Sequence, residues 1–544
     1  MASEKKVGDA LSSVVPVSPG CDTPRGESVT SLHSGQGSPQ ADDDDGYQLI
    51  ELGDGHVLVE FSDGSLKNPN NWSTGKKSYM VLAAIFLVMN SGISASLPSN
   101  CVPAIMEDFH IQGKGQNVLP TAIFLIGYVV GPLVFSPLSE TIGRRPVLSW
   151  TLTAFVLGTL ACALAPSWPS LLVFRLMCGL AGAAPQTVVG GLYADLFGDQ
   201  RTRGRVMAFY MAASSFGPII GPIISGFAVQ YGWRWTFRID VILAGCCWLY
   251  HLFMSETFAP VILKKQAARL NKVSGSTCHV SRKQLQAINA KSSFVQIFTR
   301  PITMLVTEPI VLCSAIYIAL AYSLIFFYFQ AYPIIFQRIT SSPYHSSPIY
   351  SPILTTTVGI GAVCSGLFSF YYDTIYEKAK ARGKPWTASP EMQRLPLSCI
   401  AGPCLTISLF WLAWTANRSV HWTAPVLSGL LFGLGYQTIF ISLLTYVTDA
   451  YRIYSASALA ASVILRSIVG ALFPLAADPL YASLGVEWGT SVVGFISVAC
   501  VPIPMVFLYA GPWIRKRSRF CQRLLREDEE MKGIVGGFGG VREV

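Results

Sequence analysis

Charged residues are scarce in this sequence of 544 residues: Asp, Glu, Lys and Arg together make up 13% of it. Soluble domains carry about 25% charged residues, so this composition excludes an ordinary soluble protein. The deficit is regional, because long apolar blocks alternate with short polar segments, and the mean hydropathy is +0.44. This alternation is typical of a helical protein that crosses the lipid bilayer several times.

Reactive constellations are also missing. The thirteen cysteines are scattered, and none has the spacing of a metal site or of a secreted disulfide framework. No nucleophile or phosphate-loop motif occurs, so we expect neither an enzyme nor a metal or organic cofactor, and an ion gradient rather than ATP as the energy source. The net charge of +9 comes without a basic, aromatic-rich soluble face, which argues against nucleic acid as a partner.

Apolar residues are too few to form a core at the start of the chain. Residues 1–77 are rich in Ser, Gly, Pro and Asp and include four consecutive aspartates at positions 42–45. We expect a disordered cytosolic tail. It has no cleavable signal, so the first apolar block is expected to act as an uncleaved membrane anchor.

About 20 apolar residues in a helix cross the bilayer core, and twelve blocks meet this criterion. The fold class is therefore predicted as all-α, with twelve transmembrane helices in two six-helix halves, 78–256 and 309–511. A cytosolic central loop, 257–308, separates the halves, and a cytosolic tail, 512–544, follows the second. The predicted spans are 78–98, 117–136, 147–166, 170–192, 206–230, 237–256, 309–333, 352–372, 395–415, 422–447, 455–480 and 488–511.

Lys and Arg set the predicted orientation. If the tail 1–77 is cytosolic, the inner loops between spans hold nineteen of these residues, whereas the outer loops together with the outer start of the sixth span hold five. This asymmetry places both ends of the chain in the cytosol. We expect the plasma membrane, with an internal (vacuolar) membrane as the alternative. Asn417 lies in an Asn-Arg-Ser sequon on the outer side, but its loop is so short that glycosylation is not expected.

A short polar turn between the second and third spans, Ser136–Val147, reads Ser-Pro-Leu-Ser-Glu-Thr-Ile-Gly-Arg-Arg-Pro-Val. These charges must lie outside the hydrocarbon region. Gly143 permits the left-handed backbone of a tight turn. Arg144 can reach Asp195, the carboxylate available at the same end of the fourth span.

Twelve spans with this turn after the second resemble the major facilitator superfamily. The family turn usually opens with Gly and carries Asp, and here Ser136 and Glu140 take those places. The resemblance implies a secondary carrier that works by alternating access. Glu140 can face the positive end of the eleventh span, which starts at Ser455. With Arg145, these groups would latch the halves together on the cytosolic side; a basic turn that only fixes topology is the alternative.

Arg175 lies inside the fourth span, where an arginine costs about 2.5–3.5 kcal/mol or more unless it has a partner or a wet cavity. The resemblance associates this position with proton coupling. A structural arginine that extends outward to water is the alternative. Among the acids in or near spans, Asp240 and Asp478 are placed near outer ends and Glu308 and Asp449 near inner ends, so none is chosen as the proton carrier.

The fifth span carries small residues every four positions, interrupted by prolines. This stripe permits close helix approach and bends the helix. It is similar to the antiporter motif of drug/proton exchangers within the superfamily, although packing is expected to be its direct role. Its residues are Gly217, Pro218, Gly221, Pro222 and Gly226.

Local motifs narrow the resemblance to fungal twelve-span drug:proton antiporters, the branch of polyamine and multidrug exporters. They are Asn68-Pro-Asn-Asn-Trp-Ser before the first span, Ser255-Glu-Thr-Phe-Ala-Pro after the sixth, and Asp449-Ala-Tyr between the tenth and eleventh. Phe473-Pro-Leu lies at the end of the eleventh. The match covers about residues 65–520.

A substrate cavity is expected from aromatic and amide side chains of spans one, four, seven and ten, together with a second deep arginine in span eleven. Each amide or aromatic taken singly is more often ordinary helix packing. The arginine would bind an anionic or polar substrate or form a structural charge pair. The candidates are Asn90, Gln186, Tyr322, Gln330, Tyr436, Gln437 and Arg466.

These patterns predict an antiporter that exports small organic molecules, such as drugs, toxins, secondary metabolites or polyamines, in exchange for protons. We expect it to act as a monomer. One alternative is an importer or a specific carrier of a metabolite such as an organic acid. A remote alternative is a membrane sensor that does not transport, which would normally carry longer structured tails.

Overall fold

The computed structural model describes residues 46–51, 57–113, 115–275, 279–281, 294–338, 353–389, 391–417, 419–451, 455–518 and 520–522. The predictions for residues 1–45 and for the tail beyond residue 522 lie outside these ranges. The chain divides into two compact units. One comprises Met1–Trp72 with Phe258–Ser292, and the other comprises Ser73–Thr257 with Ser293–Val544.

The smaller unit contains a three-stranded sheet in the order β1-β2-β3. Strand β1 (Tyr47–Glu51) pairs antiparallel with β2 (Val57–Phe61), which pairs in parallel with β3 (His279–Ser281) from the central loop. Helix α10 (Ala259–Ser274) packs on β2 and β3. The expectation of a disordered tail is therefore wrong for the strand residues, because pairing with a distant segment supplies the partners that a lone tail lacks.

Local interactions stabilise the short helix η1 and the sheet of the smaller unit. The short helix η1 (Pro69–Asn71) begins after Asn68, whose side chain accepts a hydrogen bond from the backbone of Asn70 at 3.1 Å. In the sheet, Tyr47 stacks on Phe61 with ring centroids 5.7 Å apart, and Val59 is fully buried. The sheet thus has a small apolar core of its own.

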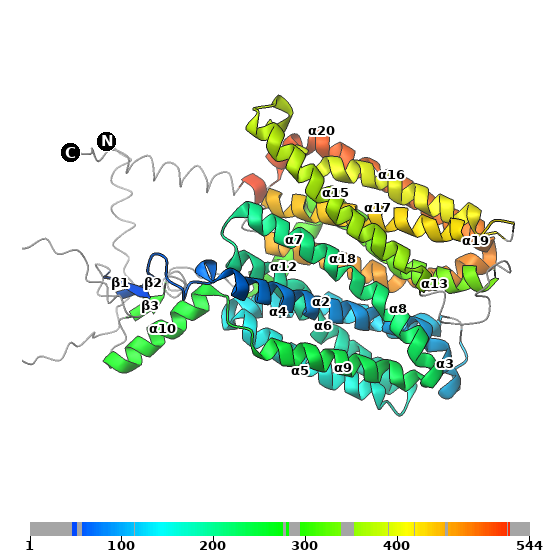
Figure 1. Ribbon diagram of the computed structural model, residues 1–544, viewed down its shortest axis with the longest axis horizontal. Helices are drawn as coiled ribbons and strands as arrows, with labels where there is room; N and C mark the ends of the chain where they lie inside the picture. Colours follow the sequence, from blue (N-terminus) through cyan, green and yellow to red (C-terminus); the bar gives the residue numbers. More distant parts are fainter. Residues whose placement is uncertain are drawn as a thin grey trace, which may run out of the picture. The chain divides into compact units, whose positions relative to one another are not determined.

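The larger unit is a helical bundle, whose helices run side by side in Figure 1. Its first half, drawn in blue to green, includes a helix for each of the six predicted spans, and the fifth is divided in two. The bounds are α2 (Thr74–Ser96), α4 (Leu119–Ile142), α5 (Arg144–Ala163), α6 (Trp168–Leu196), α7 (Gln200–Ser214), α8 (Phe216–Ala228) and α9 (Trp233–Leu252), with short η2 (Leu97–Asn100), α3 (Val102–Asp108), η3 (Gln116–Val118) and η4 (Val229–Tyr231) between them.

The second half, drawn in green to red in Figure 1, repeats this pattern after α12 (Phe294–Thr307). The bounds are α13 (Pro309–Arg338), α15 (Thr356–Ala381), η5 (Pro385–Ala388), α16 (Glu391–Thr415), α17 (Thr423–Tyr451), α18 (Ser455–Leu472), η7 (Phe473–Ala476), α19 (Ala477–Cys500) and α20 (Pro502–Arg517). Helix α15 continues nine residues beyond the predicted eighth span, which ended at residue 372.

Two interruptions have local causes. The predicted fifth span is divided at Ser215 between α7 and α8, just before Pro218, which has no N–H to continue the helical hydrogen bonds. The turn between the eleventh and twelfth spans lies at Gly485, whose φ of 77° breaks the helical geometry inside α19. A residue without a side chain adopts that angle at little cost.

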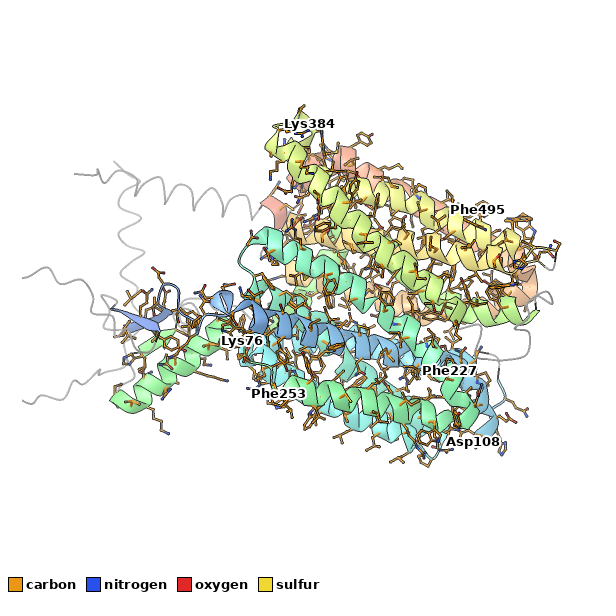
Figure 2. The ribbon with its side chains drawn as sticks, viewed as in Figure 1. Lys76, Asp108, Phe227, Phe253, Lys384 and Phe495 are labelled. Carbon is orange, nitrogen blue, oxygen red and sulfur yellow. The ribbon has the colours of Figure 1, made fainter. Side chains whose placement is uncertain are left out.

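Ten helical segments in the described ranges are long and apolar enough to cross a membrane. The predicted sixth and eighth spans, α9 and α15, have 20 and 26 residues but are not among these ten, so the count of twelve stays a prediction. Large apolar side chains cover the outside of the bundle, among them Phe253 and Phe495 at opposite edges in Figure 2. This surface fits a lipid environment better than water.

The two halves meet through a few helix pairs. Helix α4 packs against α18, while α7 and α8 pack against α15. Gly470 of α18 lies against Leu125 of α4 and against Tyr322 of α13. The Arg205 guanidinium of α7 lies 5.6 Å from the ring centroid of Phe370 in α15. Side chains at the centre of the bundle therefore come from both halves.

Candidate functional site

The turn at Gly143 forms the expected ion pair. Arg144 Nε lies 3.3 Å from Asp195 Oδ2, and both side chains are largely buried. Arg144 Nη1 also donates to Ser139 Oγ at 2.7 Å. Asp195 is next to the last residue of α6, so the ion pair joins the start of α5 to the end of α6. We call this end of the bundle the basic end; charge distribution predicts that it faces the cytosol.

Glu256, which follows α9, completes this cluster. Its carboxylate accepts hydrogen bonds from the backbone N–H groups of Arg144 at 2.9 Å, Arg145 at 3.1 Å and Thr257 at 3.0 Å. The first two are the first residues of α5, whose N–H groups have no partner inside the helix. A carboxylate at a helix N-terminus also interacts favourably with the helix dipole. Glu256 therefore caps α5 from the segment that follows α9.

The other residues predicted to form the latch differ in the contacts that the structure shows for them. The Arg145 guanidinium donates to the carbonyl of Leu252 at 3.0 Å, so within the described contacts it ties α5 to α9 in the same half. Helix α18 begins at Ser455, as expected, and packs against α4. The contact between Glu140 and the start of α18 stays a prediction.

The second half contains a matching cluster at the basic end. Arg394, near the start of α16, lies 3.3 Å from Asp373 of α15 and 3.3 Å from Asp449 near the end of α17. Arg144 and Asp195 occupy the corresponding helix ends in the first half. Sequence reasoning did not find Arg394.

A further ion pair joins Arg515, near the end of α20, to Glu391. Glu391 is the first residue of α16 and is fully buried. In the first half the carboxylate comes from the end of the sixth predicted span. In the second half the carboxylate is at the start of α16, and the end of α20 supplies the arginine. In each half a carboxylate therefore connects the start of the third helix with the end of the sixth, through backbone N–H groups in the first half and through an arginine in the second.

Arg175 is buried inside the first half, with 1% of its surface exposed. Its guanidinium donates to the carbonyls of Pro120 at 3.0 Å and Ala95 at 3.3 Å, and to Ser94 Oγ at 3.4 Å. It also lies 4.4 Å from the ring centroid of Phe124. The alternative of an arginine that extends outward to water is therefore wrong, because neutral acceptors on α2 and α4 satisfy it inside the bundle.

Asp240 of α9 lies near this arginine. It is fully buried, and neither carboxylate oxygen has a hydrogen-bond partner. The Ser94 hydroxyl is near enough to form at most a poorly aligned hydrogen bond with this carboxylate, and the Arg175 guanidinium interacts with it electrostatically. Isolated charges are very costly in an apolar interior. Asp240 is therefore a titratable group in a position where its charge has no direct compensation.

The stripe of the fifth span packs against the first span. A Cβ atom at Gly217 would lie 2.6 Å from the carbonyl oxygen of Met89, and one at Gly221 would lie 2.5 Å from that of Ile93. Pro218 contacts Gly92 of α2, while Pro222 and Gly226 are buried in α8. The interpretation of this stripe as a surface for close helix approach thus agrees with the contacts.

The second deep arginine, Arg466 of α18, lies among aromatic rings. Its guanidinium carbon is 5.0 Å from the ring centroid of Tyr322 and 5.1 Å from that of Phe440. Tyr436, on the same helix as Phe440, interacts electrostatically with this charge, as do Tyr128 of α4 and Tyr210 of α7. We call Arg466 and these five aromatic residues the Arg466 cluster.

The four amide candidates lie in different surroundings. Gln437 is fully buried beside the cluster and accepts a hydrogen bond from Ser215 of the other half. Gln186 interacts with Tyr128. Asn90 has an unpartnered Oδ1 and lines a cavity of about 10 Å³, room for about one water molecule, inside the first half. The side chain of Gln330 lies outside the described residues.

The opposite end of the bundle has its own anchor. Trp233 Nε1 and Arg234 Nη1, at the start of α9, each donate to Asp108 Oδ2 at 3.0 Å. These hydrogen bonds, that of Trp233 first, lower the pKa of Asp108. Figure 2 shows Asp108 at the end of the bundle away from Lys76 and Lys384. Asn417 is exposed between α16 and α17.

The geometry combines two halves with matching charge clusters and an aromatic centre shared between them. The family model described as Major Facilitator Superfamily matches residues 81–474. The chain belongs to this superfamily. Its members are secondary transporters, which agrees with the predicted class.

Curated relatives of this major facilitator are fungal proteins, as the local motifs predicted. The MFS transporter paaT of Penicillium rubens is 35% identical over 85% of this chain and 83% of its own length. The multidrug transporter mdrA of Aspergillus fumigatus is 34% identical over 86% and 76%. The efflux pump FUB11 of Gibberella moniliformis is 33% identical over 84% and 77%.

Solved structures support the fold. The proton:xylose symporter XylE, bound to 6-bromo-6-deoxy-D-glucose, superposes with a TM-score of 0.58 at 15% identity. The match covers 80% of this chain and 97% of that one. At this identity the likeness concerns the fold alone. The predicted all-α major facilitator fold is therefore confirmed.

Several residues of this transporter were missed by sequence reasoning. Glu256 stands in a quoted motif, but its partners lie more than 100 residues away. Arg394 has a usable signal, since it starts an apolar span as Arg144 does. Tyr128 and Tyr210 carry no signal in the sequence, because only packing brings them toward Arg466.

Proposed function

We propose that this transporter is an antiporter that exports small organic molecules in exchange for protons. The names of relatives as efflux pumps and a multidrug transporter support export. The observation that carries proton coupling is the fully buried carboxylate of Asp240, which interacts electrostatically with Arg175. The protein's role in this proposal is transport rather than catalysis, with the proton gradient as energy source and no cofactor.

Asp240 is the proton-binding residue of this proposal. Burial away from water disfavours a charged carboxylate, and Asp240 is fully buried, so in this proposal it takes up the proton during part of the transport cycle. Arg175 does not compensate a charge on Asp240 directly, because its hydrogen bonds go to two carbonyls and one hydroxyl. Release of the proton requires a conformation in which water or Arg175 reaches the carboxylate.

The other titratable groups around Asp240 do not replace Arg175. The thiols of Cys162, Cys178 and Cys247 interact electrostatically with Asp240. Arg175 is the cation among the described groups that act on Asp240. Helix α2 carries both Ser94 and Ala95, which bind Arg175, and it packs on the stripe of α8. A shift of α2 would thus alter the surroundings of both residues.

Charge clusters at the basic end provide the other part of the mechanism. Arg144 with Asp195 and Arg394 with Asp449 hold helix ends together within each half, and Glu140 with the start of α18 is the proposed latch between halves. Alternating access requires such contacts to form in one state and break in the other. We place this end in the cytosol with both termini. In this proposal the protein works as a monomer in the plasma membrane, or alternatively in a vacuolar membrane.

The test uses purified protein in lipid vesicles with an acidic lumen, where an antiporter accumulates its substrate. A panel of fluorescent drugs and organic acids serves as probes. Accumulation by the native protein supports antiport; accumulation only with an acidic exterior assigns symport, the importer alternative. No accumulation of any probe under either gradient would contradict transport.

Substitution of Asp240 then tests the proton site. Asp240→Asn imitates the neutral acid, so we expect loss of gradient-driven accumulation but retention of probe exchange between the two sides without a gradient. Asp108→Asn, a carboxylate outside the bundle core, is the control and should keep both activities. Normal gradient-driven accumulation by Asp240→Asn would exclude Asp240 as the proton carrier.

A further inference from the structure

The Arg466 cluster lies between the two halves of the transporter. Arg466 belongs to α18, and Tyr322 and Phe440 come from α13 and α17 of the same half. Tyr128 and Tyr210 come from α4 and α7 of the other half. Substrate sites of transporters of this kind lie where the halves meet near the middle of the membrane. A cation that interacts electrostatically with side chains of both halves is well placed to hold a substrate during the exchange of states.

Arg466 lacks a counter-ion among the described residues. It is 6% exposed, forms no ion pair there, and its Nε has no hydrogen-bond partner. The side-chain amide nitrogen of Gln437, Nε2, is also buried without a hydrogen-bond partner. Two buried donors, one of them charged, therefore lack acceptors. Burying such donors without acceptors costs free energy. A negatively charged acceptor would therefore bind here with a more favourable free energy than a neutral one.

The walls of the cluster are aromatic. Tyr322 and Phe440 lie within about 5 Å of the guanidinium, as expected for cation–π contacts, and Tyr436 continues the wall from α17. Flat aromatic faces suit a planar organic body next to the charge. The carboxylates at the basic end, such as Asp195 and Asp449, belong to other ion pairs.

We propose that the Arg466 cluster binds organic anions in which an acidic group is attached to an aromatic or apolar body. The acidic group would accept hydrogen bonds from Arg466 and Gln437, and the body would pack against the tyrosines. This inference rests on the proposed transport of small organic molecules and specifies their chemical class. It distinguishes such compounds from polyamines and other cations, which Arg466 would repel.

The test compares three probes that share a naphthalene ring and differ in charge. They are naphthalene-1-sulfonate, the neutral naphthalene-1-sulfonamide, and the cationic (1-naphthylmethyl)trimethylammonium. Binding to the full-length protein in nanodiscs is measured by equilibrium dialysis. We expect the sulfonate to bind about tenfold or more tightly than either other probe, because a charged hydrogen-bonded partner contributes roughly this factor. Equal binding of all three, or preference for the cation, would overturn the proposal.

Variants locate the binding. Arg466→Gln should weaken sulfonate binding by about tenfold to a hundredfold and leave the sulfonamide nearly unchanged, whereas Arg466→Lys should keep part of the preference. Arg238→Gln, which removes an exposed arginine of α9, is the matched control and should bind as the native protein does. If Arg466→Gln does not fold, Gln437→Leu should reduce the sulfonate preference by a smaller factor. Unchanged preference in both variants would overturn the proposal.

Binding needs no proton gradient, so this result is independent of the vesicle test. Sulfonate binding without gradient-driven transport would contradict the proposed antiport and leave the site intact. Transport of cations with no binding of anions would leave antiport intact and overturn the proposed substrate class.

Discussion

Arg394 lies 3.3 Å from Asp449 at the basic end of the second half, just as Arg144 lies 3.3 Å from Asp195 in the first. In each half the arginine stands near the start of the third helix and the aspartate near the end of the fourth. The correspondence shows that both halves retain one arrangement of charges, although the turn between Asp373 and Arg394 is much longer than the turn at Gly143.

Removal of either arginine should impair transport. Breaking a buried ion pair costs about 3–5 kcal/mol in the state that contains it, so Arg144→Ala should shift the balance of conformations by more than tenfold. Arg394→Ala should act in the same direction by a smaller factor, because its two aspartate partners are more than a third exposed and water screens the ion pairs. We expect strongly reduced probe transport in vesicles with normal amounts of protein in the membrane. Glu140→Ala should act in the same direction through the latch.

The neighbouring Arg145 provides the control for this prediction. Its guanidinium donates to one carbonyl and is exposed. Arg145→Ala should therefore reduce transport much less than Arg144→Ala. Equal losses in both variants would mean that the charge of the turn matters rather than the specific ion pair with Asp195.

Gly143 should tolerate no side chain. Its φ is 116°, and a Cβ atom there would lie 3.0 Å from the carboxyl carbon of Glu256. Backbone strain of this kind costs on the order of 1–3 kcal/mol. Gly143→Ala should therefore lower the melting temperature of the purified protein, measured in detergent. Gly383→Ala also has a positive φ but meets no atom within 4 Å, so it should lower the melting temperature less.

The stripe of α8 should be equally intolerant of added atoms. Gly217→Ala places a methyl group against the Met89 carbonyl and must push α8 away from α2, at a cost of about 1–3 kcal/mol. We expect lower thermal stability and slower transport. Gly245→Ala in α9, where nothing lies within 4 Å, should be neutral or slightly stabilising. A neutral Gly217→Ala would show that the close approach is unnecessary.

The anchor at Asp108 predicts a response to acid. Because hydrogen bonds from Trp233 and Arg234 lower its pKa, Asp108 contributes stability above its ordinary pKa of about 3.9. This contribution is lost as the pH falls through the lowered pKa. Melting temperatures measured from pH 7 to pH 3 should therefore fall more in the native protein than in Asp108→Asn. Parallel curves would contradict the anchor.

Sequence reasoning succeeded where local rules apply. Apolar length predicted the long helices, and the position of Asp195 at the end of the fourth span was enough to pair it with Arg144. It did not identify Asp240 as isolated, because isolation depends on which neighbours are packed around a side chain. Nor did it find the small sheet, since the strand around Leu58 becomes stable only with a partner far along the chain.

Parallel pairing of β2 with β3 also constrains biosynthesis. Val57 pairs with His279, roughly 220 residues later, and the whole first half of the bundle lies between them. At about 5–20 residues per second, roughly 10 to 45 seconds pass before the ribosome supplies β3. A hairpin of β1 and β2 alone is marginally stable, so we expect these two strands to become stable only after β3 has been synthesised. The three-stranded sheet can therefore form only after the ribosome has synthesised the first six predicted spans.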